Sequence, residues 1–272
     1  MTYWVWLAAI SAVFVIAERL RPRRREQRLL RRGIGSDAAY VVLNGHFLGV
    51  ALALLATPIE RSLTAALARA GIHLDVGVAR EWPLAAQLAV ALVGLDLLQW
   101  TIHNALHRVP WLWQIHKVHH SIEELDWLGS MRFHWGEAVV YKTLQYVPLA
   151  MLGFDGRVLF AVAVIGTAIG HYNHSNVRID LGPLRYVLNS PEMHQWHHAH
   201  PDAGPENKNF AIKFSLWDWL FRTAYLPADK RAPARLGFTG IEACPRSIWL
   251  QEVWPLSALI SRRARPQPRG ST

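Results

Sequence analysis

Long stretches without charged side chains are the feature that most restricts how this 272-residue chain can fold. The hydrocarbon core of a bilayer is about 30 Å thick, and a helix needs about 20 apolar residues to cross it. Four apolar stretches approach this length: residues 3–17, 38–59, 83–102 and 138–170. We expect the first three to span the membrane and the fourth to form a helical hairpin that turns at residues 153–156. A core of soluble helices is the alternative, although uncharged runs of this length are unusual in soluble helices.

The net charge of +9 is concentrated beside the first apolar stretch, where eight arginines lie between residues 19 and 32. A basic block can bind nucleic acid, but one that lies between two apolar helices is explained more simply by the tendency of arginine and lysine to stay in the cytoplasm. We therefore expect residues 19–36 in the cytoplasm and no nucleic-acid partner. Counting spans from there places every dense histidine cluster on the cytoplasmic side. The excess of arginine over lysine, 24 to 5, indicates a bacterial inner membrane.

These features predict an all-α fold, namely an integral membrane helical bundle of about four or five spans or half-spans, capped by a cytoplasmic histidine-rich helical domain. The single cysteine, Cys244, excludes an internal disulfide and cysteine-based zinc or iron–sulfur sites. Any metal ion must therefore be bound by histidine or carboxylate side chains.

Ten of the 14 histidines form closely spaced sets. Spacings of three and four residues place side chains on one face of a helix, so each set can point at a common centre. The pattern H-x-x-H-H occurs twice, at residues 116–120 and 194–198, and two independent coincidences of that kind are improbable. We interpret the sets as metal ligands. In chain order they are His103 and His107; His116, His119 and His120; His171 and His174; and His194, His197 and His198.

The number of histidines indicates more than one metal ion. A zinc site is complete with four ligands, or with three and a water, whereas two six-coordinate ions offer about twelve positions. Ten histidines would then leave a couple of positions open, and a pair of irons with open positions is a reasonable site for activating dioxygen. Asp96 lies on the same helical face as His103 and is a candidate to accept the second N–H of a ligand histidine. A packing hydrogen bond to a neighbouring span is the alternative for Asp96.

Six segments follow one another in a characteristic order: DLLQWTIHNALH (96–107), HKVHH (116–120), RFHWGE (132–137), HYNHSN (171–176), SPEMHQWHH (190–198) and NKNFAIKFSLWDWLFRT (207–223). This ordered series resembles the fatty acid hydroxylase and sterol desaturase superfamily of membrane di-iron enzymes. The resemblance implies a catalytic domain at residues 92–226. Membrane helices with a basic cytoplasmic loop would precede it at residues 1–91, and a C-terminal segment with a basic tail would follow it at residues 227–272.

The resemblance further implies that all ten histidines are ligands of two iron ions per chain. The least secure pair is His171 and His174, because the spacing between them varies in the family. His134 and Glu137 lie in the RFHWGE segment and would either pack helices or support the ligands. The implied reaction is O2-dependent hydroxylation or desaturation of an unactivated C–H bond in a sterol, a fatty acyl chain or a related lipid. The sequence contains no flavin, haem or iron–sulfur motif, so an external donor must supply the two electrons.

Two other functions are open at this point. A histidine-rich membrane metal transporter would place polar residues through the middle of several spans, and a bis-histidine haem electron carrier would need few histidines. For the enzyme, we expect a lipid to enter from the bilayer and to stop with its reactive carbon beneath His103 and His171. The channel that receives it would be apolar, with Gly94 and Gly166 facing it.

Overall fold

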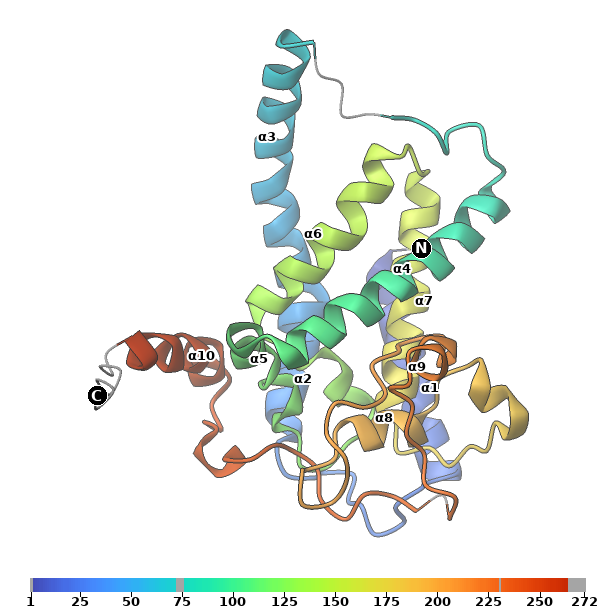
Figure 1. The fold of residues 1–272 in the computed structure, drawn as a ribbon, viewed down its shortest axis with the longest axis vertical. Helices are drawn as coiled ribbons and strands as arrows, with labels where there is room; N and C mark the ends of the chain where they lie inside the picture. The colour runs from blue at the N-terminus through green and yellow to red at the C-terminus, as the bar shows by residue number, and fades with distance from the viewer. Residues whose placement is uncertain (1, 72–75, 230, 264–272) are drawn as a thin grey trace, which may run out of the picture.

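The structure is a computed structural model and describes residues 2–71, 76–229 and 231–263 (Figure 1). The part of the predicted basic tail that follows residue 263 lies outside the described residues. The α-helices are α1 (Tyr3–Leu20), α2 (Ile34–Val42), α3 (Leu48–Arg69), α4 (Leu84–Arg108), α5 (Pro110–His116), α6 (Trp135–Met151), α7 (Gly156–His174), α8 (Pro191–His197), α9 (Leu216–Leu220) and α10 (Ile248–Arg263). Shorter turns are the π-helical η1 (Leu43–Phe47) and the 3-10 helices η2 (His119–Ser121), η3 (Trp127–Met131), η4 (Gly182–Tyr186) and η5 (Ile241–Ala243).

The described part of the chain has no β-sheet, only two isolated bridges, which confirms the all-α prediction. In Figure 1 the long helices α3, α4, α6 and α7 fill the upper part of the molecule, and the short helices α8 and α9 lie below them with the long loops. Among the described residues, α1 and α4 are the helices long and apolar enough to cross a bilayer. The predicted number of spans therefore stays a prediction.

The second predicted span, residues 38–59, is part of a longer helical segment. Residues 34–69 are helical throughout, because the π-helical η1 joins α2 to α3 without a break. The wider turn presents Asn44, whose side-chain amide donates to the backbone carbonyls of Met131 and Phe133 at 2.8 Å. Single π-turns inside α-helices frequently mark functional regions. Here the turn fastens this helix to the segment that carries the RFHWGE motif.

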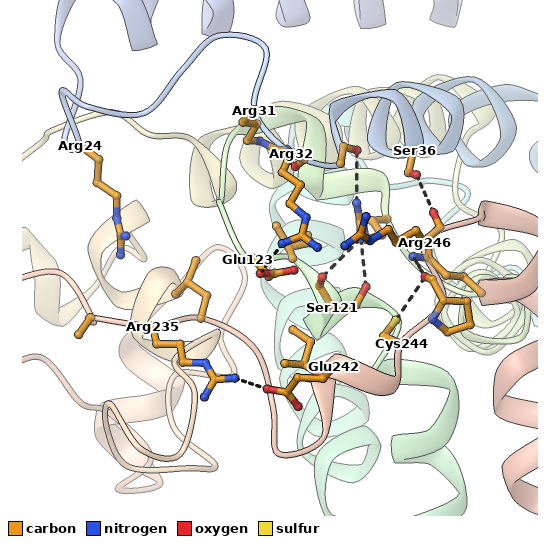
Figure 2. A pocket seen from close by; sticks show the side chains of 18 residues that line it. Arg24, Arg31, Arg32, Ser36, Ser121, Glu123, Arg235, Glu242, Cys244 and Arg246 are labelled. Atoms are coloured by element: carbon orange, nitrogen blue, oxygen red, sulfur yellow. Dashed lines mark hydrogen bonds and ion pairs between the residues drawn. The ribbon is translucent and has the colours of Figure 1, made fainter.

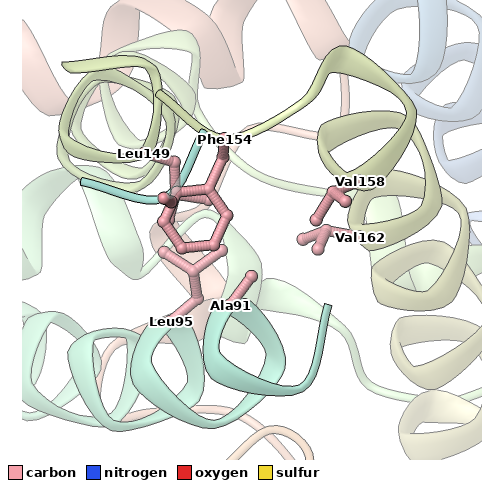
Figure 3. Packing of buried hydrophobic residues seen from close by; sticks show 7 residues of the cluster. Ala91, Leu95, Leu149, Phe154, Val158 and Val162 are labelled. Carbon is pink, nitrogen blue, oxygen red and sulfur yellow. The ribbon is translucent and has the colours of Figure 1, made fainter. Parts of the chain in front are cut away.

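The predicted hairpin is confirmed, with α6 ending at Met151 and α7 beginning at Gly156. Gly153 makes the turn with φ of +78°, a conformation that costs a residue with a Cβ roughly 1 kcal/mol or more. Asp155 then caps α7 by accepting from the backbone N–H of Arg157 at 2.7 Å. Figure 3 shows how the hairpin packs on α4. The buried side chains at this contact are Ala91 and Leu95 of α4, and Leu149, Phe154, Val158 and Val162 of the hairpin. This contact joins the first half of α4 to the first half of α7.

Asp96 connects α4 to a distant loop. Its carboxylate accepts from the backbone N–H groups of Lys213 and Phe214 at 2.9 and 2.8 Å, and from the indole N–H of Trp217 at 3.0 Å. The prediction that Asp96 accepts from a ligand histidine is wrong, because these donors occupy its oxygens. The alternative, a packing hydrogen bond, agrees better with these contacts, although the partner is the loop before α9 and not a neighbouring span.

A second carboxylate, that of Asp218 in α9, makes a similar set of contacts. Its partner on α4 is Trp100, one helical turn beyond Asp96. Asp218 accepts from the backbone N–H groups of Phe210 and Ala211, each at 2.9 Å, and from the indole N–H of Trp100 at 3.0 Å. Burial raises the pKa of Asp218, while the hydrogen bonds lower it. The two aspartates together hold residues 207–223 across the end of α4, where the histidines gather.

The basic loop between α1 and α2 is fixed by buried ion pairs. Arg31 donates to Asp37 and Asp126, and Arg132 also donates to Asp37. Figure 2 shows Arg31 and Arg235 at the wall of a cavity of about 710 Å³ between this loop and the C-terminal segment. The sequence indicated only the side of the membrane for this loop. The ion pairs show that its arginines also attach it to the segments around the histidine motifs.

Candidate metal centre

Nine of the ten predicted ligand histidines converge in two adjacent groups. Within each group, one potential ligand nitrogen from every histidine lies within 4.8 Å of the others. Rings from the two groups are in contact: His120 and His198 stack with their centroids 4.4 Å apart. The five-histidine group is His103, His107, His116, His120 and His197. The four-histidine group is His119, His174, His194 and His198.

The chain folds in a way that brings these histidines together from distant segments. α4 supplies His103 and His107 in its last two turns, and Pro110 at the first position of α5 starts a new helix almost at once. α5 and η2 then return the HKVHH motif toward α4, while α8, capped by Ser190, supplies the second H-x-x-H-H motif. Each motif is divided between the two groups. Each copy of the doubled motif therefore contributes histidines to both groups.

The five-histidine group contains contacts that hydrogen bonds cannot satisfy. The Nε2 atoms of His107, His116 and His120 form a triangle with sides of 3.1, 3.1 and 3.2 Å. Each imidazole nitrogen has one in-plane site, either a hydrogen or a lone pair, so it can take part in one hydrogen bond only. Three such atoms cannot be paired with one another. A cation between them accepts all three lone pairs, and the donor set therefore fits a metal ion.

An unsatisfied buried nitrogen supports the same reading of the five-histidine group. The Nδ1–H of His197 donates to the carbonyl of Lys208 at 2.8 Å, which leaves a lone pair on Nε2. That Nε2 is buried and has no hydrogen-bond partner. Buried polar atoms are nearly always satisfied, so an atom of this kind inside a histidine cluster indicates a missing ligand such as a cation.

The four-histidine group is an open chain of nitrogens. The Nε2 atom of His174 lies 3.1 Å from that of His119 and 3.1 Å from that of His194, and the Nε2 atoms of His194 and His198 are 3.2 Å apart. The group has one histidine fewer than its neighbour. If each centre held a six-coordinate ion, the first would keep one position open and the second two.

Backbone carbonyls orient the rings. The Nδ1–H groups of His103, His119 and His174 donate to the carbonyls of Phe210, Arg132 and Gly170 at 2.8, 2.8 and 2.9 Å. Each bond fixes the tautomer that turns the Nε2 lone pair toward the cluster. Sequence reasoning assigned this supporting role to Asp96 and missed the carbonyls. A carbonyl acceptor has no residue type of its own, so no sequence signal could have identified it.

The protonation state of the histidines outside the long helices also suits metal binding. Burial lowers the pKa of His119 to about 4, and it lowers the pKa values of His116, His120, His194, His197 and His198 well below the ordinary value. Neighbouring histidines lower most of these pKa values further, because a positive charge on one ring opposes a positive charge on the next. The imidazoles are therefore neutral near pH 7 and carry the lone pairs that a metal requires.

The RFHWGE segment contributes one residue to the centre and one to helix capping. Glu137, buried in the first turn of α6, has a carboxylate oxygen 3.0 Å from the Nδ1 of His116, at an angle outside that of a hydrogen bond. His134 lies elsewhere: its Nδ1 accepts from the N–H of Gly136 at the start of α6, and its Nε2 donates to the carbonyl of Glu252 in α10 at 2.7 Å. Of the two alternatives for this segment, Glu137 fits support of a candidate ligand and His134 fits helix packing.

His171 is the predicted ligand that the structure does not bring into either group. Its Nδ1 lies 2.8 Å from the hydroxyl of Ser130, its Nε2 lies 3.2 Å from the hydroxyl of Ser11, and its ring packs against Trp127. The side chain sits almost one helical turn before His174 and faces α1 instead of the cluster. Both nitrogens are occupied, so we remove His171 from the candidate ligand set.

A cavity of about 660 Å³ opens onto both histidine groups. Its wall includes His103 and His116 from the first group, and His119, His174 and His194 from the second. Apolar side chains line much of the remainder, among them Val50, Leu95, Phe133, Phe160 and Val162. A volume of this size is typical of sites for small organic molecules. Of the two glycines predicted to face the channel, Gly166 lines this cavity, whereas Gly94 is not among its lining residues.

Comparison with known proteins agrees with this arrangement. The sequence model of the fatty acid hydroxylase family matches residues 88–223, half of the chain. The chain is 27% identical to the ornithine lipid hydroxylase OlsE of Rhizobium tropici over 239 residues, which cover 87% of this chain and 71% of that protein. It is 30% identical to the alkylglycerol monooxygenase of Homo sapiens over 135 residues, which cover 49% of this chain and 29% of that protein.

A third relative is the very-long-chain aldehyde decarbonylase GL1-10 of Oryza sativa subsp. japonica, 26% identical over 156 residues that cover 56% of this chain and 51% of that protein. No solved structure matches the chain. The family match spans every segment that supplies a histidine to the two groups. The chain therefore belongs to the fatty acid hydroxylase family and is an oxidoreductase of that lipid-oxidising class.

Proposed function

We propose that this protein is a membrane-bound di-iron enzyme that uses O2 to hydroxylate an unactivated C–H bond of a lipid. The observation that carries the proposal is the cavity of about 660 Å³ whose wall is apolar on most sides and is formed by histidines of both groups at one end. A lipid chain in this cavity would reach the two metal sites directly. The catalytic unit is residues 92–226, with the N-terminal helices at residues 1–91 and the C-terminal segment at residues 227–272 completing the chain.

The five-histidine group would hold one iron ion and the four-histidine group the other. When bound, the two ions would supply the oxygen-activating chemistry, which inserts one oxygen atom of O2 into the C–H bond and releases the other as water. This reaction consumes two electrons and two protons from an external donor. Relatives named as a hydroxylase and a monooxygenase favour hydroxylation over desaturation, which would remove two hydrogens from the same site.

The protein's own residues orient the histidine rings and shield them from water. The carbonyls of Phe210, Arg132 and Gly170 hold the rings that they contact, and the buried carboxylate of Glu137 lies beside His116. The ring of Trp113 packs against those of His107 and His120, with centroids 5.2 and 5.3 Å apart. A preorganised, water-excluded site suits chemistry that would otherwise oxidise the wrong group.

In the proposed topology, α1, the continuous helix of residues 34–69 and α4 each cross the bilayer, and the histidine-bearing segments cap the bundle in the cytoplasm of a bacterium. The mean hydropathy of α1 and α4 and the arginine-rich loop that follows α1 support this orientation. In a Cys244→Ser background, a cysteine placed at Glu124 or Pro205 should react with an impermeant thiol reagent only after the membrane is opened. Reaction in intact cells would reverse the orientation.

The two other functions receive less support. A bis-histidine haem needs a flat macrocycle between two facing rings, whereas here ring nitrogens from different segments approach to 3.1–3.2 Å. A transporter needs ligands distributed along a path across the bundle. The described groups instead collect at the C-terminal ends of α4 and α7 and in the short helices beyond them.

The proposed function is tested by growing cells that express the protein under ¹⁸O2 and analysing their lipids by mass spectrometry. We expect a lipid that gains one ¹⁸O atom, and we expect this product to be absent with His116→Ala or His174→Ala, which remove a histidine from the first and second group. His200→Gln serves as the matched control, since His200 pairs with Asp202 outside both groups. A labelled product that persists in both alanine variants would contradict the assignment of the site.

A further inference from the structure

The cavity beside the metal centre has a polar side as well as an apolar one. Lys142 and Gln145 both line it, and they lie three residues apart on α6, so their side chains share one face of the helix. Ionisable residues among apolar membrane helices are costly and usually face the protein interior for a functional reason. These two side chains are the part of the cavity wall that the proposed hydroxylation does not require.

Gln145 has an unsatisfied donor. Its side chain is 8% exposed, and its amide Nε2 is buried without a hydrogen-bond partner. An unpaired buried amide destabilises the fold, and a protein tolerates it when a ligand restores the missing bond. Two other polar groups of the wall are already engaged: the Asn44 amide donates to two carbonyls, and the hydroxyl of Tyr3 pairs with that of Thr167 at 2.7 Å.

Lys142 is a cation without a counter-ion among the described side chains. It is partly buried, and its ammonium group points toward α3, 3.9 Å from the position that a Cβ on Gly49 would occupy. The other lysine of the wall, Lys213, differs in this respect, because it donates to Gln99 and lies 3.5 Å from Asp96. Among the described residues, the cavity therefore offers one positive charge without a counter-ion beside one amide donor without a partner.

We propose that Lys142 and Gln145 bind an anionic oxygen group of the lipid substrate, either a carboxylate or a phosphate. Both side chains donate hydrogen bonds, so the complementary group is an acceptor that carries negative charge. This inference rests on the proposed function, since it names the class of lipid that enters the same cavity.

The position of the two residues also limits where the lipid is oxidised. On α6, Lys142 and Gln145 follow Glu137, the neighbour of His116, by five and eight residues, which is about 7.5 and 12 Å along the helix axis. An anionic group held there would place the metal centre several carbons along the chain from that group, within about 12 Å measured along α6. The oxidised carbon therefore belongs to the polar end of the lipid and not to the far end of an acyl chain.

The test compares three probes with the same 18-carbon chain: oleate, oleyl phosphate and oleyl alcohol. Dissociation constants are measured on the purified metal-loaded protein without reductant, so that no turnover interferes. We expect at least one anionic probe to bind about tenfold or more tightly than the alcohol. Lys142→Met should bring that ratio to within about threefold, Lys142→Arg should preserve it, and Gln145→Leu should reduce it in part.

Arg157→Met is the matched control, because Arg157 is an exposed cation on the same hairpin and pairs with Asp155 away from the cavity. The better of the two anionic probes identifies the group as carboxylate or phosphate. Equal binding of all three probes to the wild type, or an anion preference that survives Lys142→Met, would overturn the inference. Neither result bears on whether a metal-dependent hydroxylation occurs, and the absence of an ¹⁸O-labelled lipid from wild-type cells would not alter the binding ratios.

Discussion

At the scale of single residues, the geometry of the imidazole ring determines which histidines can act as ligands. A ligand needs one nitrogen free for the metal, and a partner on the other nitrogen fixes the tautomer where it is present. His103, His119, His174 and His197 meet this condition through backbone carbonyls. His171 does not, because serine hydroxyls engage both of its nitrogens. Neighbours three residues apart on α7 thus have different roles.

This difference leads to a prediction about metal content. His174→Gln should release the metal of the four-histidine group, leaving about one ion per chain, since three histidines and a longer amide cannot reproduce the site. His171→Gln should retain about two ions per chain. Elemental analysis of protein purified without chelators measures both. One ion in the His171 variant would restore the ligand role that its motif implies.

Glu137 is the one predicted carboxylate that lies beside a histidine of the centre. Its oxygen is 3.0 Å from the Nδ1 of His116, and supporting partners of this kind change metal affinity by about 10–100-fold. Glu137→Gln keeps the shape but removes the ionisable carboxyl group, so it should weaken binding at the five-histidine group by about tenfold and leave the four-histidine group unchanged. Competition with a chelator should then show one site weakened, whereas a uniform loss at both would point to a folding defect.

At the scale of elements, the hairpin of α6 and α7 depends on a turn that only glycine makes without strain. Gly153 has φ of +78°, and a Cβ there would lie 2.8 Å from the Cγ of Arg80 and 3.0 Å from the Cα of Gly77. The turn is therefore in close contact with the segment that leads into α4.

We expect Gly153→Ala to lower the free energy of unfolding by about 1–3 kcal/mol, through strain at positive φ and the close approach to Gly77. The matched control is Gly156→Ala, because a Cβ at Gly156 meets nothing within 4 Å and the residue starts a helix. Thermal unfolding in detergent compares the two variants. Equal midpoints for both would mean that the turn relaxes freely.

At the scale of the whole molecule, the cavity is defined by segments that are far apart in the sequence. Gly166 of α7 lines it, and a Cβ at this position would meet no atom within 4 Å, so a larger side chain there would enter the cavity. Gly94 of α4 also has free space around it but lies outside the cavity lining. The two positions form a natural pair for testing where the lipid lies.

Gly166→Leu should reduce oxidation of the longest lipid chains by about tenfold or more while both metals are retained, because a few extra methylenes in an apolar site discriminate on that scale. Gly94→Leu should leave the chain-length profile unchanged. Product profiles over a series of chain lengths, with metal content measured in parallel, provide the test. A shift caused by Gly94→Leu alone would place the lipid on the other side of α4.

The sequence by itself indicated the class of protein and the type of ligand at its candidate site. Its repeated H-x-x-H-H motifs, lone cysteine and uncharged stretches indicate a helical membrane protein with a histidine-bound metal centre, because spacing along a helix and ligand type are local properties. Tertiary structure decided the rest. It divided each motif between two groups and turned His171 away. It also paired Asp96 with the backbone of a loop and placed Gly166, but not Gly94, in the cavity wall. Those outcomes depend on which segments meet in space and on carbonyl acceptors that no residue type reveals.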